Sequence, residues 1–115
     1  MTGLTTHILD TANGKPANGV NILLFRGEET QPLGQWQSNA DGRCDAPLLA
    51  ENQMQAGVYR LEFAVAAYFR AQGHTLPEPP FLDKVVIRFG IAQTTAHYHV
   101  PLLVSPFGYS TYRGS

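Results

Sequence analysis

Three of the four histidines lie in runs where apolar and polar residues alternate, and histidine is the side chain that changes protonation near neutral pH. His7 lies in the middle of the run over residues 4–10. His97 and His99 are two residues apart, so both rings project from the same face if their segment is a strand. Such a face could supply a general base, or two ligands of a zinc or copper ion. Taken singly, however, a strand histidine such as His7 is usually a half-exposed surface residue.

The metal interpretation is the weaker of the two because the ligands are too few. A structural zinc ion takes four ligands. The chain contains one cysteine, Cys44, and its remaining histidine, His74, lies in a distant loop. We therefore expect no bound metal and no other cofactor, and we interpret Cys44, which cannot form an internal disulfide, as a small apolar filler.

Arg43 follows directly on the turn that Asp41 and Gly42 form, and two roles are open to it. Its planar guanidinium could hold a carbonyl oxygen or an oxyanion through two hydrogen bonds. It could equally be a solvated charge that pairs with Asp41 or Asp45. The pattern around it does not decide between these roles. The chain has no nucleophile elbow, phosphate-binding glycine loop or paired-carboxylate signature, which removes the commonest serine-hydrolase, nucleotide-binding and glycosidase interpretations.

Short strands must position these residues, because apolar residues recur with period two in runs that turn residues separate. The cleanest strand alternates over residues 58–65 and should line the core from Tyr59 onward. A short helix over residues 66–72 ends at Gly73, and three prolines follow. The remaining strands are expected over residues 4–10, 20–25, 33–37, 85–91, 97–104 and 107–112, with a brief one after Arg43 that leads to Pro47.

Many short strands, little helix and no repeat favour an all-β sandwich of two antiparallel sheets with one short helix. Pro101 should restrict its strand to a sheet edge or an irregular stretch, since proline cannot donate to a ladder. The last strand runs almost to the end of the chain, so we expect the C-terminus to be paired into a sheet.

Composition indicates one soluble domain over residues 1–115: 43% of the residues are hydrophobic, 15% are charged, and the formal net charge is −1. The few Lys and Arg residues are spread out, so nucleic acid and anionic membranes are not expected partners. No segment approaches the roughly 20 apolar residues that span a bilayer, and the first residues lack the pattern of a secretory signal. We therefore expect a cytoplasmic location.

Four segments together resemble the 5-hydroxyisourate hydrolases, which are relatives of transthyretin. The segments are LTTHILDT at residues 4–11, NADGR at 39–43, HYHVPLL at 97–103 and SPFGYSTYRGS at 105–115. The match runs from Leu4 to Ser115. It implies the transthyretin-like sandwich, a homotetramer built as a dimer of dimers, and hydrolysis of 5-hydroxyisourate to 2-oxo-4-hydroxy-4-carboxy-5-ureidoimidazoline in urate degradation.

The resemblance also implies an active site in the channel where subunits meet. His7, Arg43, His99 and Ser115 would be its catalytic residues. His7 and Arg43 would bind substrate together with Tyr112, Arg113 and Gly114. The resemblance assigns the principal histidine to His99, and His97 stays an open case because a strand that bends at Pro101 need not keep both rings in the pocket.

The alternative from another class is a carrier of small ligands like transthyretin itself, without catalysis. The resemblance argues against a carrier, because transthyretin lacks these histidines, the arginine and the Tyr-Arg-Gly-Ser ending. An enzyme of this kind needs water, an imidazole that removes a proton from it, and a guanidinium that stabilises the oxyanion. Which histidine is the base, and whether the hydroxyl or the carboxylate of Ser115 takes part, stays open.

Overall fold

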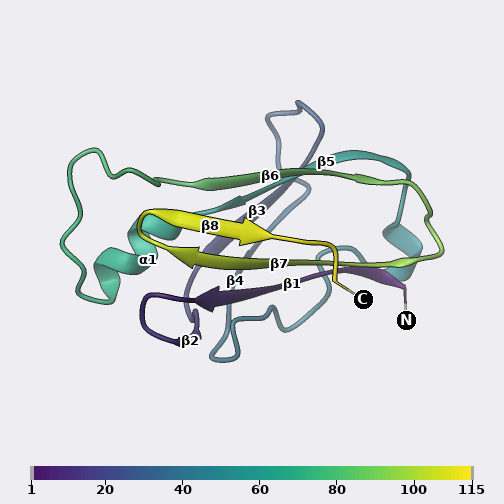
Figure 1. Cartoon of the computed structure of the whole chain (residues 1–115). Helices are drawn as coiled ribbons and strands as arrows, with labels where there is room; N and C mark the ends of the chain where they lie inside the picture. The colour runs from purple at the N-terminus through teal and green to yellow at the C-terminus, as the bar shows by residue number, and fades with distance from the viewer. Residues whose placement is uncertain (1, 115) are drawn as a thin grey trace.

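The computed structural model describes residues 2–114 and contains short strands, one α-helix and one 3₁₀ helix (Figure 1). The α-helix, α1, spans Val65–Ala71, and the 3₁₀ helix spans Glu51–Gln53. The strands are β1 (Gly3–Asp10), β2 (Lys15–Pro16), β3 (Asn21–Arg26), β4 (Gly34–Gln37), β5 (Gly57–Phe63), β6 (Val85–Ile91), β7 (His97–Ser105) and β8 (Gly108–Thr111).

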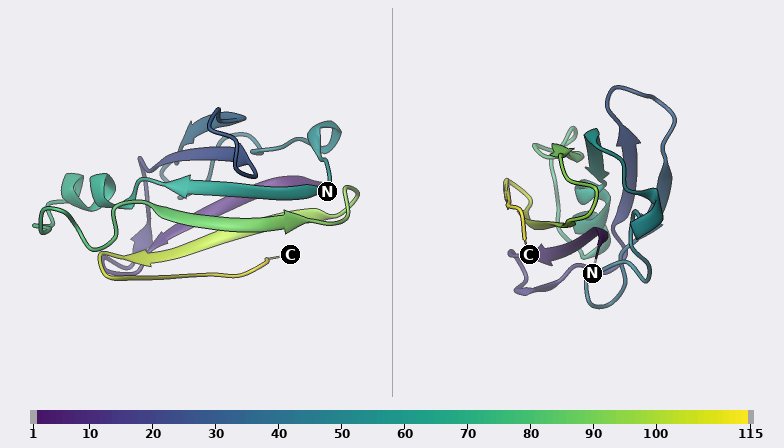
Figure 2. Two further views of the ribbon diagram at one scale, coloured as in Figure 1. Left: turned by 90° about the horizontal axis from the view of Figure 1, so that it is seen from above. Right: turned by 90° about the vertical axis from the view of Figure 1, so that its right-hand side faces the viewer.

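The strands form two four-stranded sheets that face each other, as the end view in Figure 2 shows. One sheet has the order β2-β1-β7-β8 and the other β4-β3-β5-β6. The predicted sandwich with one short helix is confirmed. It differs in one pair: β1 and β7 run parallel, from Gly3 opposite His97 to Asp10 opposite Val104. This pairing brings the two ends of the chain together.

Alternation sorts the strand residues between the core and the outer faces. On β1, Leu4, Thr6 and Ile8 are buried, whereas Thr5 and His7 are only half-buried on the opposite face. The same alternation on β7 leaves both histidines half-buried on that outer face. The predicted inward line of β5 is also confirmed. The largest fully buried side chains are Tyr59, Phe63, Phe69, Leu4, Ile8, Ile22, Leu24, Leu61, Ile91 and Leu102.

The short helix lies at one end of the sandwich, where β5 leads into it (Figure 1). It begins one residue before the predicted start and ends one residue before the predicted end. Gly73 follows it with a φ of 93°, a left-handed conformation that glycine adopts without the strain of a side chain. Within residues 2–114, no helix is long and apolar enough to cross a membrane.

The prediction that Pro101 confines its strand to an edge or an irregular stretch is wrong, because β7 is a regular strand between β1 and β8. The ladder between β7 and β8 begins one residue later, with Leu102 opposite Thr111. The hydroxyl of Thr111 donates to the carbonyl oxygen of Pro101 over 2.7 Å. The N–H that Pro101 lacks therefore falls just outside the ladder between β7 and β8, and β7 can lie inside the sheet.

The prediction of a brief strand after Arg43, leading to Pro47, is also wrong. Arg43 makes a single antiparallel bridge with His7, residues 44–47 form no strand, and Leu49 makes a second bridge with Leu4 of β1. Gly42 keeps the turn before Arg43 close to β1, because its carbonyl oxygen accepts from the N–H of Ile8 over 2.7 Å. An added Cβ at Gly42 would collide with the Ile8 carbonyl oxygen.

Candidate active site

A cavity of about 420 Å³ opens on the outer face of the β2-β1-β7-β8 sheet. Thr5, His97 and His99 line it from the paired strands β1 and β7. The segment from Arg43 to Pro47, which crosses beside β1, lines it from the other side. Residues about 90 positions apart in the sequence thus share one cavity because the first and seventh strands are neighbours.

One hydroxyl group connects the two histidines of β7. Thr5 Oγ1 lies 2.8 Å from Nδ1 of His99 and 3.2 Å from Nε2 of His97. Thr5 is directly opposite His99 in the parallel register. Both rings therefore face the cavity, including that of His97, and the Nδ1 contact leaves Nε2 of His99 as the ring nitrogen available to a ligand.

The pKa of His99 is lowered below its ordinary value, and burial of the ring is the largest cause. Coulombic interactions with Arg43, and secondarily with His7 and His97, lower it further. Its imidazole is consequently neutral at pH 7, and a neutral imidazole can accept a proton.

Arg43 brings an exposed guanidinium to the rim of the cavity. None of the three ion pairs found between residues 2 and 114 involves it, so neither Asp41 nor Asp45 claims its charge there. Asn39 stabilises the turn, because its Oδ1 accepts hydrogen bonds from the N–H of Asp41 over 2.9 Å and from the N–H of Arg43 over 3.2 Å. The backbone at Arg43 is thus fixed in the turn, while its guanidinium has no hydrogen-bond or ion-pair partner among residues 2–114.

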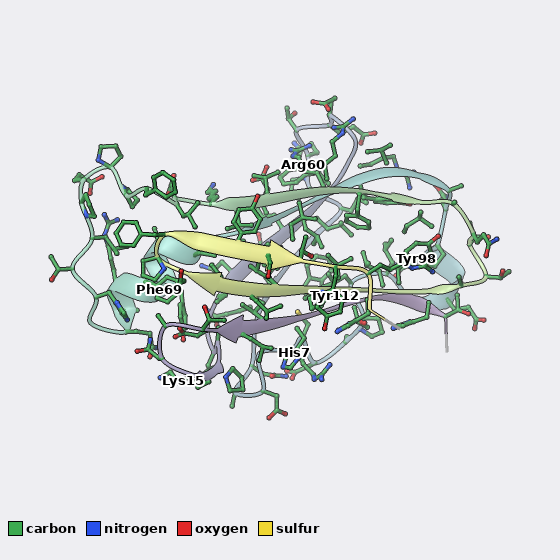
Figure 3. The ribbon with its side chains drawn as sticks, viewed as in Figure 1. His7, Lys15, Arg60, Phe69, Tyr98 and Tyr112 are labelled. Carbon is green, nitrogen blue, oxygen red and sulfur yellow. The ribbon has the colours of Figure 1, made fainter. Side chains whose placement is uncertain are left out.

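His7 lies beside the cavity rather than in its lining. Its Nε2 contacts the backbone carbonyl oxygen of Asp41 over 2.8 Å. A carbonyl oxygen only accepts, so this nitrogen carries the proton and Nδ1 is the nitrogen left free. Figure 3 labels His7 on β1 and Tyr112 beyond β8, with β7 between those two strands.

The predicted site residues of the C-terminal segment lie in two different places: Gly114 lies against His99, whereas Tyr112 and Arg113 line another hollow. Gly114 pairs with His99, and its N–H donates to the His99 carbonyl oxygen over 2.7 Å. Tyr112 and Arg113 line a second hollow, of about 240 Å³, between β6 and β8. There the Arg113 guanidinium lies 4.1 Å from the centre of the Tyr98 ring. Ser115 lies outside the described residues.

The pairing of Gly114 with His99 leaves no room for a side chain at position 114. A Cβ at this position would lie 2.7 Å from Cδ2 of the His99 ring, a distance that real Cβ atoms do not show. The His99 ring occupies the space that a side chain would need. The Gly114 position therefore helps to hold that ring in place.

Cys44 lies in the cavity wall and is half-buried. Burial, and secondly the charge of Asp45, raises the pKa of its thiol to about 11. The thiol is therefore protonated at neutral pH and is a poor nucleophile. Among residues 2–114, no three His, Cys, Asp or Glu side chains gather closely enough to hold a metal ion.

Thr5 is the site residue that sequence reasoning missed. The available signal was its position two residues before His7 on the same strand face. Only the in-register parallel pairing of β1 with β7 places it against His99, and no local pattern predicts that pairing.

Comparison with known proteins gives consistent matches over the whole chain. The model of the HIUase/Transthyretin family matches residues 4–114. A 5-hydroxyisourate hydrolase of Ralstonia nicotianae is 56% identical over all of this chain and all of its own length. The structure of Klebsiella pneumoniae 5-hydroxyisourate hydrolase is similar with a TM-score of 0.81 and 38% identity, over 97% of this chain and 98% of that one. (S)-allantoin synthase matches with a TM-score of 0.91 and 42% identity; the match covers 98% of this chain but 43% of that protein.

Proposed function

The chain belongs to the HIUase/transthyretin family, and from that premise we propose that it hydrolyses 5-hydroxyisourate in the cavity between β1, β7 and the segment from Arg43 to Pro47. The observation that carries this proposal is a neutral imidazole, His99, beside a guanidinium that has no ion-pair partner among residues 2–114, in a cavity large enough for a small heterocycle. The product is 2-oxo-4-hydroxy-4-carboxy-5-ureidoimidazoline.

His99 is the general base of the proposed reaction. It lines the cavity and is neutral, and its Nε2 is free, whereas His7 lies outside the lining. Nε2 takes a proton from water as the water oxygen bonds to the ring carbonyl carbon, and the C=O electron pair moves to oxygen. When the resulting oxyanion collapses, the C–N bond breaks and the same Nε2 returns its proton to the leaving nitrogen.

Arg43 stabilises the oxyanion. Its fork of N–H donors reaches the cavity without a competing carboxylate among the described side chains. Donors fixed in advance at the point where negative charge develops are among the largest contributions to catalysis. Burial is the main reason that the pKa of His99 is lowered, and the charge of Arg43 lowers that pKa further, so the same guanidinium also helps to keep the base neutral.

His7 stabilises the turn before Arg43 by donating its Nε2–H to the Asp41 carbonyl oxygen, and Nδ1 of His7 stays free. Gly114 pairs with His99, and Ser115 follows Gly114 directly in the sequence, which supports a role for the Ser115 hydroxyl in holding water. Tyr112 is 61% exposed in the single chain, and we propose that it and Arg113 contact substrate when protomers assemble.

The assembly that we propose is a homotetramer built as a dimer of dimers. Two edge strands, β6 and β8, lie on the same side of the sandwich with unpaired outer edges. Exposed edges of this kind invite pairing with a second copy. Large apolar side chains are exposed on them or just beyond them: Val86, Tyr109 and Tyr112. The outer face that carries the cavity would meet the same face of another pair, which would enclose the site.

We also propose that the enzyme works in the cytoplasm. The chain has one cysteine, and Cys44 is a free thiol. A protein that relies on no disulfide suits a reducing compartment. Fractionation of the native host with an antibody to the chain would test this location.

The loss of ultraviolet absorbance of freshly made 5-hydroxyisourate tests the proposed function. We expect added protein to accelerate the loss well beyond the buffer rate, both before and after treatment with a chelator. A rate equal to that of buffer would favour the alternative, a non-catalytic carrier of small ligands. Loss of activity with the chelator, restored by a metal, would contradict the metal-free mechanism.

A further inference from the structure

The hydroxyl of Thr5 is shared by two imidazoles that both line the cavity. It lies 2.8 Å from Nδ1 of His99 and 3.2 Å from Nε2 of His97. A hydroxyl has one proton to donate, and a neutral imidazole has one N–H and one bare nitrogen. If the hydroxyl donates to one ring, its bond to the other ring must be one that it accepts.

When the rings are neutral, two arrangements satisfy both contacts and also give the Thr5 hydroxyl proton an acceptor. In a third, both rings would donate to Thr5, and its proton would have no acceptor among residues 2–114. In the first, His99 donates its Nδ1–H to Thr5, and the Thr5 hydroxyl donates to Nε2 of His97. In the second, every proton is reversed: His97 donates to Thr5, Thr5 donates to Nδ1 of His99, and Nε2 of His99 carries a proton toward the cavity. The first arrangement makes His99 a base, and the second makes it an acid.

We propose that Thr5 is a positioning residue that fixes the tautomer of His99 and ties it to the tautomer of His97. This inference rests on the proposed function, which requires a bare Nε2 on His99. The resting chain then runs from His99 Nδ1–H through the Thr5 hydroxyl to His97 Nε2, and His97 acts on the reaction only through Thr5.

The surroundings of the three residues support a fixed chain. Thr5 is held on β1, directly opposite His99, by the parallel ladder. The His99 ring is confined on its other side by Gly114, where no Cβ would fit. His97 Nδ1 is buried and has no hydrogen-bond partner among residues 2–114, so the bond to Thr5 is the one hydrogen bond of the His97 ring there. In the resting chain this Nδ1 carries the proton of His97 without an acceptor, a cost that the fixed His99 tautomer must outweigh. A single hydroxyl thus controls both rings.

Two variants of Thr5 separate the hydroxyl from the shape of the side chain. Thr5→Val keeps the size and the strand preference and removes the hydroxyl, whereas Thr5→Ser keeps the hydroxyl. We expect Thr5→Val to lower kcat roughly tenfold or more with little change in KM, because a ring without a fixed tautomer spends much of its time with Nε2 protonated. Thr5→Ser should restore most of the wild-type kcat.

Nitrogen NMR of histidine-labelled protein reads the tautomers directly and needs no substrate. We expect His99 in wild type and Thr5→Ser to carry its proton on Nδ1, and we expect Thr5→Val to shift it toward Nε2. A His99 tautomer that is unchanged in Thr5→Val, or already Nε2–H in the wild type, would overturn the inference even if the enzyme is active. If the tautomers behave as expected but wild type does not accelerate the loss of 5-hydroxyisourate, the proposed function fails and the hydrogen-bond chain stands.

Discussion

The imidazole of His7 donates its Nε2–H to the backbone carbonyl oxygen of Asp41 over 2.8 Å. This bond joins β1 to the turn that ends in Arg43, and the isolated bridge between His7 and Arg43 extends the same connection. His7 therefore stabilises the turn that carries Arg43, and it also lies beside the cavity.

A comparison of His7→Gln with His7→Ala tests this support. The glutamine amide can still donate to the Asp41 carbonyl oxygen, whereas alanine leaves that oxygen without its partner. Since small misplacements of a catalytic group cost on the order of a hundredfold in rate, we expect kcat/KM of His7→Ala to fall by about that factor and that of His7→Gln to fall less. Equal losses in the two variants, measured by substrate absorbance, would mean that the donated bond is unimportant.

Gly114 tests how tightly the His99 ring is held. In Gly114→Ala, the new methyl group would lie 2.7 Å from Cδ2 of that ring, so the ring or the tail must move. We expect kcat to fall by roughly tenfold or more, with the melting temperature changed little. Gly108→Ala is the matched control in the same segment, because its Cβ would meet only Ser105 Oγ, at 3.8 Å. A wild-type kcat in Gly114→Ala would show that the ring has room to spare.

Arg43 should set the acid limb of the pH profile. Catalysis needs neutral His99, so kcat/KM falls as pH decreases through the lowered pKa of that residue. Arg43→Met removes a positive charge that lowers this pKa; the pKa should rise, and the acid limb should move to higher pH. Arg43→Lys keeps the charge and loses the fork, so the limb should stay while kcat falls by about 10²–10³. An acid limb at the same pH in Arg43→Met and wild type would contradict this account.

The hydrogen bonds of buried Asp10, away from the cavity, should contribute to the stability of the fold. Tyr68 donates to its Oδ2 over 2.7 Å, and Asn13 donates to it as well. Tyr68→Phe leaves a buried carboxylate short of a donor, so we expect a loss of about 1–3 kcal/mol in the free energy of unfolding at pH 7, measured in urea. Tyr59→Phe, whose hydroxyl donates to the neutral carbonyl of Gln55 over 2.7 Å, should cost about 1 kcal/mol.

The pH dependence of this loss has a defined sign. Burial alone would raise the pKa of Asp10, but hydrogen bonds from Asn13, Tyr68 and two backbone N–H groups outweigh it and lower the pKa below 3.8. The contribution is therefore complete above the unfolded value near 3.8 and is lost as pH falls through the lower folded value. The difference between wild type and Tyr68→Phe should shrink in that acid range. A difference that is constant from pH 7 to pH 2 would exclude the ionised carboxylate as its cause.

Local patterns in the sequence were enough to predict most of the fold, because alternation, turn residues and the helix stop at Gly73 act within a few residues. The parallel pairing of β1 with β7 was beyond them, since it joins segments about 90 residues apart. That pairing decides the site: it places Thr5 between His97 and His99, and it makes β7 an inner strand in spite of Pro101. Family resemblance, rather than spacing, pointed to Arg43 and Gly114.

The central claim is that neutral His99 removes the proton from water in this cavity. The most direct measurement is the rate at which wild type and His99→Asn consume freshly made 5-hydroxyisourate at pH 7.5, with circular dichroism to show that the variant is folded. We predict that wild type accelerates the loss and that His99→Asn lowers kcat by about 10²–10⁴, the usual contribution of a general base. A folded His99→Asn variant with the kcat of wild type would contradict the claim.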